Sequence, residues 1–289
     1  MTKPRATLMG IAAILLWALL ALFTVWSAPT PPFLLNTICF AIGGTCGFVY
    51  IVRTTGLQIL RTVPLRVYMF GTVGLFGYHA LYFSALRLAP AAEAGLIAYL
   101  WPLLIVVGSG LLPGERVRKG HILGAVVGFA GAAMIVTGGD AGLQWQYLPG
   151  YGLALLCALT WSSYSVLSRL IGNAPTQSVA VFCVAAAALS LPLHLIFEET
   201  VFPATALGWL SILMLGLGPV GLAFFVWDIG MKRGDIQFLG AASYAAPLLS
   251  TLFLVVTGIA TFTPSLVMAA VLVAGGAVLA ARASWSRTG

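Results

Sequence analysis

The sequence predicts an all-α integral membrane protein with ten transmembrane helices, arranged as two inverted five-helix repeats. Hydrophobic residues make up 61% of the 289 residues and charged residues only 7%, whereas roughly 25% of the residues in a soluble domain are charged. The apolar residues are grouped into runs of about 20, the length that a helix needs to cross a bilayer. The pattern of the first half also returns in the second half, which indicates a duplicated unit.

Ten apolar runs follow one another along the chain, separated by short loops. They do not alternate between apolar and polar residues, as the strands of a membrane barrel would. Because backbone groups in hydrocarbon must be hydrogen-bonded within their own segment, the runs are predicted to be helices. The ten predicted spans are residues 7–27, 32–52, 67–86, 91–112, 120–137, 149–170, 177–197, 206–230, 236–258 and 264–281.

The Lys and Arg residues are divided unequally between the two sides of the membrane. Ten spans place both termini on one side, and 13 of the 14 Lys and Arg residues fall on that side. Arg87 is the exception. Basic loops stay in the cytoplasm, so we expect a multi-pass protein of the bacterial inner membrane with both termini cytoplasmic. The same rule accounts for the net charge of +7, and we expect lipid, not nucleic acid, around the chain.

The two halves share a motif in their fourth and ninth spans. The segment 99–104 (YLWPLL) matches the segment 244–249 (YAAPLL), and Gly95 matches Gly240 at the same spacing. The chain therefore divides into residues 1–142 and 143–289, with five spans in each half. Because five is odd, the second half enters the membrane from the opposite face. Alternating-access transporters have this architecture, with the substrate near the midplane where the repeats meet.

The third and fourth spans carry polar and aromatic residues where lipid does not favour them. Tyr78 lies near the middle of its span, far from the interfacial belt in which a membrane tyrosine is otherwise expected. His79 is costly in lipid, so it faces either a cavity or a hydrogen-bonding partner on a neighbouring helix. Tyr82 shares a helix face with Tyr78. Tyr99 and Trp101 follow in the fourth span.

Further candidate residues come from the first, sixth and ninth spans. Trp17 of the first span corresponds to Trp161 of the sixth. Trp161 and Tyr164 belong to a stripe of aromatic and hydroxyl residues on one helix face, which must meet protein or water. The predicted substrate-binding residues are Trp17, Tyr78, His79, Tyr82, Tyr99, Trp101, Trp161, Tyr164, Ser243 and Tyr244.

Prolines interrupt both copies of the shared motif. Pro102 removes a backbone hydrogen bond and frees a carbonyl near Ala98, which could accept a bond from a substrate ammonium. A kink that only improves packing is the alternative. Pro247 repeats the arrangement in the second half. The predicted hinge residues are Pro90, Pro102, Gly234 and Pro247.

The fifth span contains the small-residue series Gly120, Gly124 and Gly128. This spacing allows two membrane helices to approach closely, and the small residues of the tenth span are the expected counterpart. We expect a monomer, with a homodimer formed through these faces as the alternative.

No catalytic, metal or cofactor site is expected. The sequence lacks nucleotide-binding loops, nucleophile elbows and zinc-protease motifs. The four cysteines lie inside apolar runs without metal or redox spacing. No Lys or Arg lies mid-span, so phosphorylated substrates, which need cations, are disfavoured. An integral-membrane enzyme is the alternative class, for which no nucleophile or metal cluster is visible.

The ten spans, the inverted halves, the Gly114-Glu115-Arg116 turn and the aromatic-Pro-Leu-Leu motifs resemble the EamA-type members of the drug/metabolite transporter superfamily. The resemblance covers the whole chain, although Ile259 stands where the first half has Glu115. The aromatic residues resemble most closely those of the bacterial exporters of aromatic amino acids.

This resemblance implies a secondary transporter that exports aromatic or hydrophobic amino acids and related amphipathic metabolites by alternating access. Aromatic side chains would stack on the substrate ring and attract its ammonium. A broad exporter of drugs or hydrophobic cations is the alternative. Proton coupling and facilitated diffusion both stay open, since His79, Glu93 and Asp228 are the only ionisable groups near the pathway.

Overall fold

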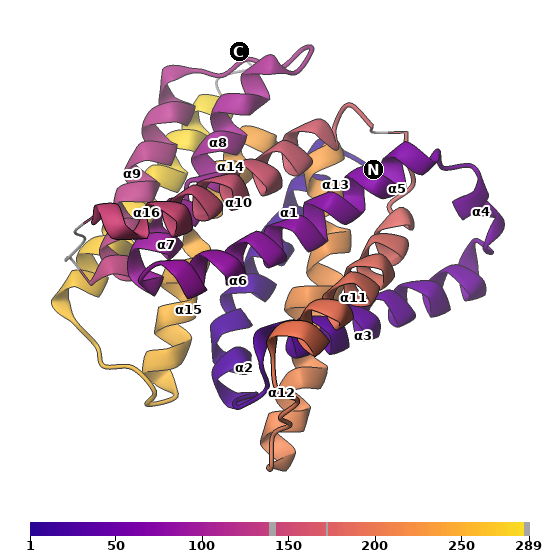
Figure 1. The fold of residues 1–289 in the computed structure, drawn as a ribbon. Coiled ribbons are helices and arrows are strands. Elements are labelled where there is room, and N and C mark those ends of the chain that lie inside the picture. The colour runs from indigo at the N-terminus through magenta and orange to yellow at the C-terminus, as the bar shows by residue number, and fades with distance from the viewer. Residues whose placement is uncertain (139–142, 172, 286–289) are drawn as a thin grey trace.

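The computed structural model describes residues 1–138, 143–171 and 173–285, and these residues form helices without any strand (Figure 1). The first half contains five membrane-length segments, several of which are interrupted. Its helices are α1 (Lys3–Ala18), α2 (Leu20–Trp26), α3 (Pro32–Thr54), α4 (Gln58–Arg61), α5 (Leu65–Thr72), η1 (Val73–Gly77), α6 (Tyr78–Leu88), α7 (Ala91–Ala98), α8 (Trp101–Gly108), η2 (Ser109–Leu111) and α9 (Lys119–Thr137).

The second half repeats this order with a longer, uninterrupted opening helix. The predicted boundary between the halves, after residue 142, lies outside the described residues. The helices of the second half are η3 (Trp145–Tyr147), α10 (Leu148–Leu167), α11 (Ser178–Phe197), α12 (Ala206–Leu217), η4 (Gly218–Leu222), α13 (Ala223–Arg233), α14 (Ile236–Ala242), α15 (Ala245–Val256) and α16 (Pro264–Trp285).

The membrane spans agree with the sequence prediction. The described residues contain nine helical segments that are long and apolar enough to cross a membrane. The tenth is the continuous segment formed by α5, η1 and α6, whose hydropathy is lowered by its tyrosines, glycines and His79. The ten predicted spans are therefore confirmed, and the segment with the weakest lipid preference is the one that carries the predicted site residues.

Two π-helical turns mark equivalent places in the two halves. The turn η1 covers Val73–Gly77 and the turn η4 covers Gly218–Leu222, which is the same segment 145 residues later. The helices that follow, α6 and α13, also begin and end 145 residues apart. π-helical turns are rare in proteins, and those that occur are frequently found at functional sites. The sequence analysis did not predict either turn.

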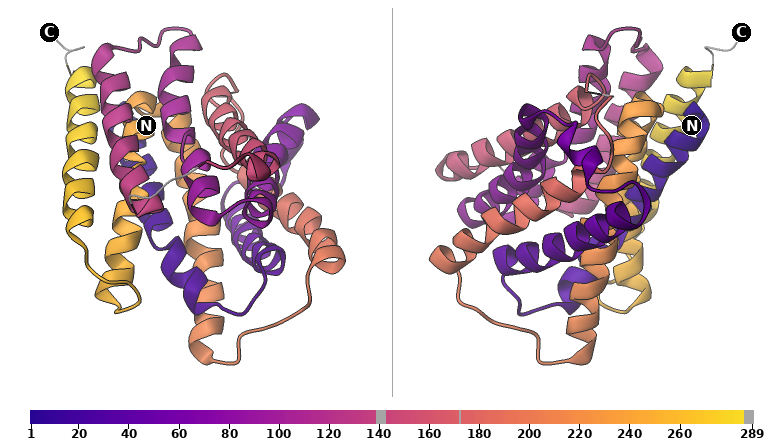
Figure 2. Two further views of the ribbon diagram at one scale, coloured as in Figure 1. Left: turned by 60° about the vertical axis from the view of Figure 1, so that its left-hand side comes forward. Right: turned by 90° about the vertical axis from the view of Figure 1, so that its right-hand side faces the viewer.

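The equivalent helix turns of the two halves lie at opposite ends of the bundle. The α6–α7 turn contacts Gly150 at the start of α10, whereas the α13–α14 turn contacts Thr7 near the N-terminus. The start of α9 is bonded to Ala283 near the C-terminus, so α10 begins at the far end. This is the inverted arrangement that five spans per half require. The start of α1 and the end of α16 lie towards the same end (Figure 2), which we call the terminal end.

The fifth and tenth spans pack against each other through glycine, as the sequence predicts. A Cβ on Gly124 would lie 2.5 Å from the carbonyl oxygen of Gly276, and a Cβ on Gly120 would lie 2.9 Å from the Cβ of Ala283. Close backbone approach of this kind is what small residues permit. Figure 2 shows α9 and α16 side by side at the edge of the bundle.

Candidate substrate site

Four tryptophan rings meet in the interior, one from each of α1, α8, α10 and α13. The ring centroid of Trp17 lies 5.0 Å from that of Trp227, 5.8 Å from Trp161 and 6.2 Å from Trp101. The Trp101 ring is edge-on to both Trp161 and Trp227, at 6.4 and 5.9 Å. Pairs of aromatic rings prefer these separations and edge-on or offset geometries. We call these four rings the tryptophan cluster.

The tyrosines of α6 extend the tryptophan cluster away from the terminal end. The Tyr78 ring lies 5.7 Å from Trp161 and is parallel to Tyr82, with 6.1 Å between centroids. Tyr78, Tyr82 and Tyr99 are half-buried, whereas Trp161 and Trp227 are buried. The tyrosine rings are therefore more exposed than the rings of Trp161 and Trp227.

His79 is held by its own helix and by neighbouring rings. Its Nδ1 lies 2.8 Å from the carbonyl oxygen of Leu75. A carbonyl can only accept a hydrogen bond, so Nδ1 carries the proton in this contact and Nε2 is left as the acceptor. The ring packs edge-on against Phe40, at 5.1 Å, and against Phe224, at 6.1 Å. This hydrogen bond corresponds to neither of the two alternatives from the sequence, because its partner is a backbone carbonyl of the same helical segment, one turn back.

Tyr164 packs against the Trp161 ring of the tryptophan cluster. Its ring stacks on Trp161 at 5.2 Å and faces Phe70 at 5.5 Å. Gly74, in the π-helical turn, makes room for it, since a Cβ there would lie 2.5 Å from the ring. The Tyr164 hydroxyl is buried and has no hydrogen-bond partner among the described residues. A buried hydroxyl left unpaired costs free energy, so this atom is a candidate for contact with a ligand.

Ser243 and Tyr244 are not brought to the tryptophan cluster. The Ser243 hydroxyl donates to the Leu239 carbonyl at 2.7 Å, within its own helix. The Tyr244 ring is fully buried on the other side of the bundle, against Phe129 at 6.0 Å. Its hydroxyl accepts a hydrogen bond of 3.1 Å from the backbone N–H of Leu103.

The position of Tyr244 has a simple packing reason. Gly128 of α9 has no side chain where the Tyr244 ring lies, and a Cβ there would come within 2.8 Å of it. The Leu103 N–H is free because the helix is interrupted between α7 and α8. The tyrosine hydroxyl satisfies that donor. Tyr244 therefore joins the second hairpin, which consists of the eighth and ninth spans around the α13–α14 turn, to the fourth span of the first half.

The predicted hinge residues lie at helix interruptions. Pro90 precedes α7, and Gly234 ends α13. Pro102 follows an interruption at Tyr99 and Leu100, and Pro247 follows the equivalent interruption between α14 and α15. The prolines therefore stand in the first turn after each break, where the missing N–H costs no intrahelical bond.

The sequence analysis missed Trp227 and Phe224 as members of the site. The signal was present, because a spacing of 145 residues places Phe224 opposite His79 and Trp227 opposite Tyr82. The Trp227 indole N–H donates to the Ser165 hydroxyl at 3.1 Å. This hydroxyl belongs to the polar stripe that the sequence predicted on the sixth span.

A buried ion pair lies next to the tryptophan cluster, on its terminal side. The Asp228 carboxylate lies 2.9 Å from the Lys232 ammonium and accepts a hydrogen bond of 2.7 Å from the Thr176 hydroxyl. The Asp228 side chain is 2% exposed and that of Lys232 is 7% exposed. The sequence analysis assigned Lys232 to a cytoplasmic loop, but α13 continues to Arg233 and the lysine turns inward.

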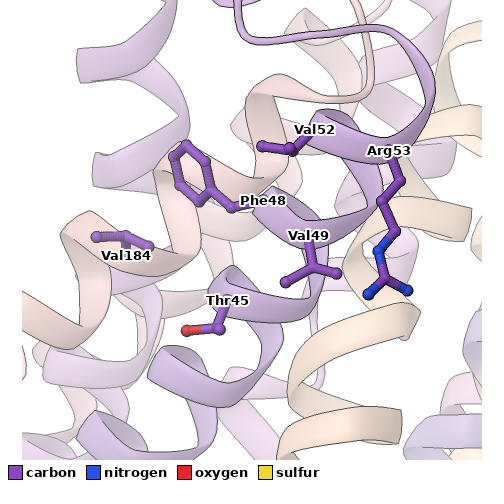
Figure 3. Close-up of a pocket in the computed structure, with 6 residues that line it drawn as sticks. All are labelled: Thr45, Phe48, Val49, Val52, Arg53 and Val184. Carbon is purple, nitrogen blue, oxygen red and sulfur yellow. The ribbon is translucent and has the colours of Figure 1, made fainter.

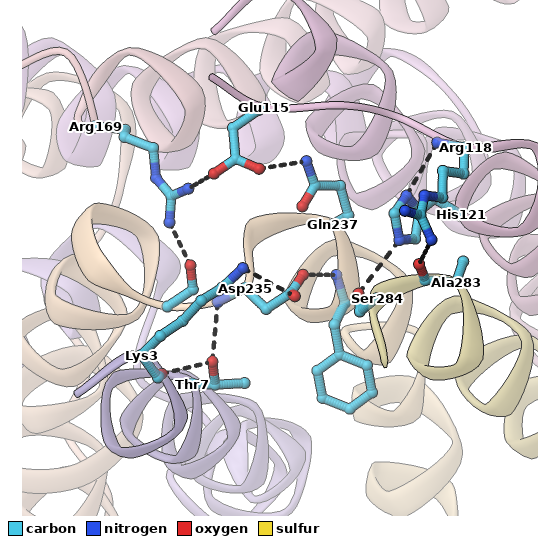
Figure 4. Close-up of polar contacts among 12 residues, drawn as sticks. Lys3, Thr7, Glu115, Arg118, His121, Arg169, Asp235, Gln237, Ala283 and Ser284 are labelled. Atoms are coloured by element: carbon cyan, nitrogen blue, oxygen red, sulfur yellow. Dashed lines mark hydrogen bonds and ion pairs between the residues drawn. The ribbon is translucent and has the colours of Figure 1, made fainter. Parts of the chain in front are cut away.

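Polar contacts close the terminal end around the α13–α14 turn (Figure 4). The Arg169 guanidinium donates to the carbonyl oxygens of Met231, at 2.8 Å, and Gly234, and it pairs with the Glu115 carboxylate. Gln237 donates to the same carboxylate at 2.9 Å. Glu115 belongs to the turn that follows the fourth span, so these contacts join the two halves.

The N-terminal helix takes part in the same closure. The backbone N–H of Asp235 donates to the Thr7 hydroxyl at 2.9 Å, and the Lys3 ammonium lies 3.2 Å from the Asp235 carboxylate. Burial acts to raise the pKa of this carboxyl, but the Phe238 N–H and the Lys3 charge outweigh it, and the pKa is lower than its ordinary value. We call the contacts of Arg169 and Asp235 the terminal network.

The opposite end carries the single basic residue that the charge count placed there. Arg87 lies 3.3 Å from the Glu198 carboxylate, which also accepts from the Phe33 N–H at 2.9 Å and from His194 at 3.0 Å. This carboxylate satisfies free N–H groups at the start of α3, where a helix favours negative charge.

A separate groove runs along the outside of α3, with a volume of about 570 Å³ (Figure 3). Its lining is mainly apolar and exposed, as with Val49 and Val52, and it ends at Arg53. It contains no ring of the tryptophan cluster. Its apolar lining suits contact with lipid acyl chains. Among the described residues, no group of His, Cys, Asp and Glu could hold a metal ion.

Comparison with known proteins decides the family. The model of the EamA-like transporter family matches the chain twice, over residues 4–137 and 148–282. The chain belongs to the EamA-like transporter family. This agrees with the resemblance read from the sequence, and it makes the chain a multi-pass membrane transporter. Each of the two matched regions contains a π-helical turn and, later in the chain, a helix pair that is interrupted before a proline, α7–α8 in the first region and α14–α15 in the second.

Two proteins named as aromatic amino acid exporters are similar to this chain along most of its length. The aromatic amino acid exporter YddG of Ancylobacter novellus is 52% identical over 283 residues, which cover 97% of this chain and 98% of the relative. The aromatic amino acid exporter YddG of Salmonella typhimurium is 26% identical, covering 87% and 88%. A crystal structure 50% identical in sequence superposes with a TM-score of 0.94 and covers 100% of both chains.

Proposed function

We propose that this chain is a secondary transporter that exports aromatic and hydrophobic amino acids, together with related amphipathic metabolites. The tryptophan cluster carries the proposal. It lies in the interior of a membrane protein, where the first and sixth spans meet the two hairpins, and it continues into the half-buried rings of Tyr78 and Tyr82. The 52% identical relative is itself an aromatic amino acid exporter.

The proposed binding mode uses both the faces and the edges of these rings. The substrate ring stacks on Tyr78, Tyr82 or Tyr99 and rests against Trp161, each contact contributing about 0.5–1.5 kcal/mol beyond the burial of area. The ring faces also attract the substrate ammonium. Together these rings form one aromatic surface, which we call the binding wall. It is completed by four further residues predicted from the sequence, Trp17, His79, Trp101 and Tyr164. Ser243 and Tyr244 instead support the second hairpin from behind.

Transport then occurs by alternating access. In this structure the terminal network joins the two halves at one end, and we propose that the half-buried rings of Tyr78 and Tyr82 are reached from the other end. The two hairpins α6–α7 and α13–α14 pivot on the breaks beside Pro90, Pro102, Gly234 and Pro247, as inverted repeats allow. Opening the terminal end requires the Arg169 contacts to break. The tryptophan cluster then becomes accessible from the terminal end.

The terminal end is proposed to be the cytoplasmic end in the bacterial inner membrane. The described Lys and Arg residues lie at that end, with the exception of Arg87, as the positive-inside rule predicts. The halves 1–142 and 143–289 then enter from opposite faces. A reporter that is active only in the periplasm should be silent when fused after residue 289, and a periplasmic signal there would reject the topology.

The alternative, a broad exporter of drugs or hydrophobic cations, is favoured by the same ring faces, since these attract organic cations of many shapes. An enzyme is not proposed, because the chain belongs to a family of transporters. We propose that the monomer is the functional unit, since the small-residue face of α9 is occupied by α16.

Counterflow in proteoliposomes tests the proposal. Vesicles loaded with unlabelled tryptophan should take up labelled phenylalanine, and external tyrosine should compete while serine and a hydrophobic cation should not. Equal competition by the hydrophobic cation would favour the broad exporter. Uptake that equals that of empty vesicles would reject transport of aromatic amino acids, and recovery of a chemically altered substrate would indicate an enzyme.

A further inference from the structure

The ion pair of Asp228 and Lys232 lies inside a membrane-spanning helix, where ionisable side chains are rare. Both side chains are almost completely buried in the last part of a membrane span, and both carboxylate oxygens are engaged, one by Lys232 and one by Thr176. Lys232 also donates to the Ala174 carbonyl at 2.9 Å. Ionisable residues inside a membrane protein are costly, and they often mark the path of a substrate.

The pair adjoins the tryptophan cluster. Asp228 follows Trp227 in the chain, and the Trp227 indole is bonded to Ser165 on α10. The unpartnered hydroxyl of Tyr164 belongs to the residue that precedes Ser165 on α10. An aromatic wall, a free hydroxyl donor and two opposite charges are thus gathered in one place.

An amino acid zwitterion carries the complementary set of charges. Its ammonium can replace Lys232 at the carboxylate of Asp228, and its carboxylate can pair with the ammonium of Lys232 and accept from Tyr164. The exchange keeps every charge paired, and no net charge enters the membrane interior. A ligand with only an ammonium or only a carboxylate would leave one protein charge unpaired, which is costly when the charge is buried.

We propose that Asp228 and Lys232 form the recognition site for the α-ammonium and α-carboxylate of the substrate, and that their mutual ion pair is the empty state of this site. The site selects zwitterionic amino acids over amines and carboxylic acids with the same side chain. It lies on the terminal side of the tryptophan cluster, where a substrate arriving from the cytoplasm first meets the protein interior. The inference depends on the proposed function.

Binding to the purified protein in detergent tests the site without interference from passive permeation. Three ligands share one ring and differ in charge: phenylalanine, phenethylamine and 3-phenylpropionate. Wild type should bind phenylalanine at least tenfold more tightly than either of the others. Asp228→Asn should remove the preference over 3-phenylpropionate, and Lys232→Met should remove the preference over phenethylamine. Each variant should therefore remove the preference for phenylalanine over a different ligand.

A purely structural ion pair would give a different result. If both variants weaken all three ligands by the same factor, or leave the ranking of wild type, the inference is overturned. The double variant Asp228→Asn with Lys232→Met leaves no unpaired charge and should bind the three ligands with similar affinity, and a retained preference for phenylalanine would also overturn it.

Thr176→Val provides a variant that keeps both charges and removes only one hydrogen bond to Asp228. Because the proposed exchange replaces Lys232 and leaves the Thr176 bond in place in both states, this variant should keep the ligand ranking of wild type, and a lost preference for phenylalanine would count against the site. If wild type itself neither binds nor exchanges phenylalanine, the proposed function fails and takes the inference with it. If wild type exchanges phenylalanine but the rankings do not move, only the inference fails.

Discussion

Replacement of Tyr82 by alanine tests the proposed binding wall with little risk to the fold. The Tyr82 ring is half-buried and is parallel to Tyr78 at 6.1 Å, so its removal takes away a face that a substrate can reach. Loss of one stacking contact with its buried area should cost about 1–3 kcal/mol of substrate binding. A loss of 1.4 kcal/mol corresponds to about tenfold in Kd.

The control is a ring of similar size outside the site. Trp209 is 49% exposed and stacks on Phe202, at 5.5 Å, near the start of α12. Both alanine variants are purified, checked for folding by size-exclusion chromatography, and compared with wild type in phenylalanine counterflow over a range of concentrations.

The two variants should differ clearly in this assay. Tyr82→Ala should raise the half-saturating concentration about tenfold or more, and Trp209→Ala should leave it within about twofold. If Tyr82→Ala transports like wild type while Trp209→Ala does not, the substrate does not contact the α6 tyrosines and the proposed wall is wrong.

Three further predictions concern the scaffold. Gly128→Leu should lower stability by about 1–3 kcal/mol in thermal unfolding, since its side chain would overlap the Tyr244 ring; an unchanged melting temperature would mean that the ring lies elsewhere. Arg169→Met should increase cysteine labelling at positions near the tryptophan cluster from the cytoplasmic side, because the terminal network is lost, and unchanged labelling would show that other contacts close this end. The lowered pKa of Asp235 predicts a contribution to stability that is present above its ordinary pKa and lost as the pH falls through the lowered value. Melting curves between pH 3 and 7 should therefore show a steeper acid loss for wild type than for Asp235→Asn, and parallel curves would contradict this.

The sequence was sufficient for the spans because hydropathy is a local property. Each predicted run corresponds to a helical segment, and the inverted order follows from the odd number of spans per half. The repeat at 145 residues also contained Trp227 and Phe224, which correspond to Tyr82 and His79. They could have been predicted if the spacing had been applied to the aromatic residues and not only to the proline motif.

Other features depend on contacts that local sequence does not encode. Tyr244 resembles Tyr99 in its motif, yet it is buried elsewhere because Gly128, more than 100 residues away, leaves room for its ring. Lys232 follows the charge rule of a loop, but Asp228 one turn earlier draws it inward. In both cases a partner from the tertiary structure decides where the side chain lies.

Photolabelling tests the position of the site most directly. A photoactivatable phenylalanine analogue is bound to the wild-type protein, irradiated, and mapped by mass spectrometry, with and without an excess of phenylalanine. The account predicts labelled peptides that contain Tyr78 or Trp161, with labelling suppressed by phenylalanine. Labelling confined to the outer groove at residues 45–53, or labelling that phenylalanine does not suppress, would contradict a substrate site at the tryptophan cluster.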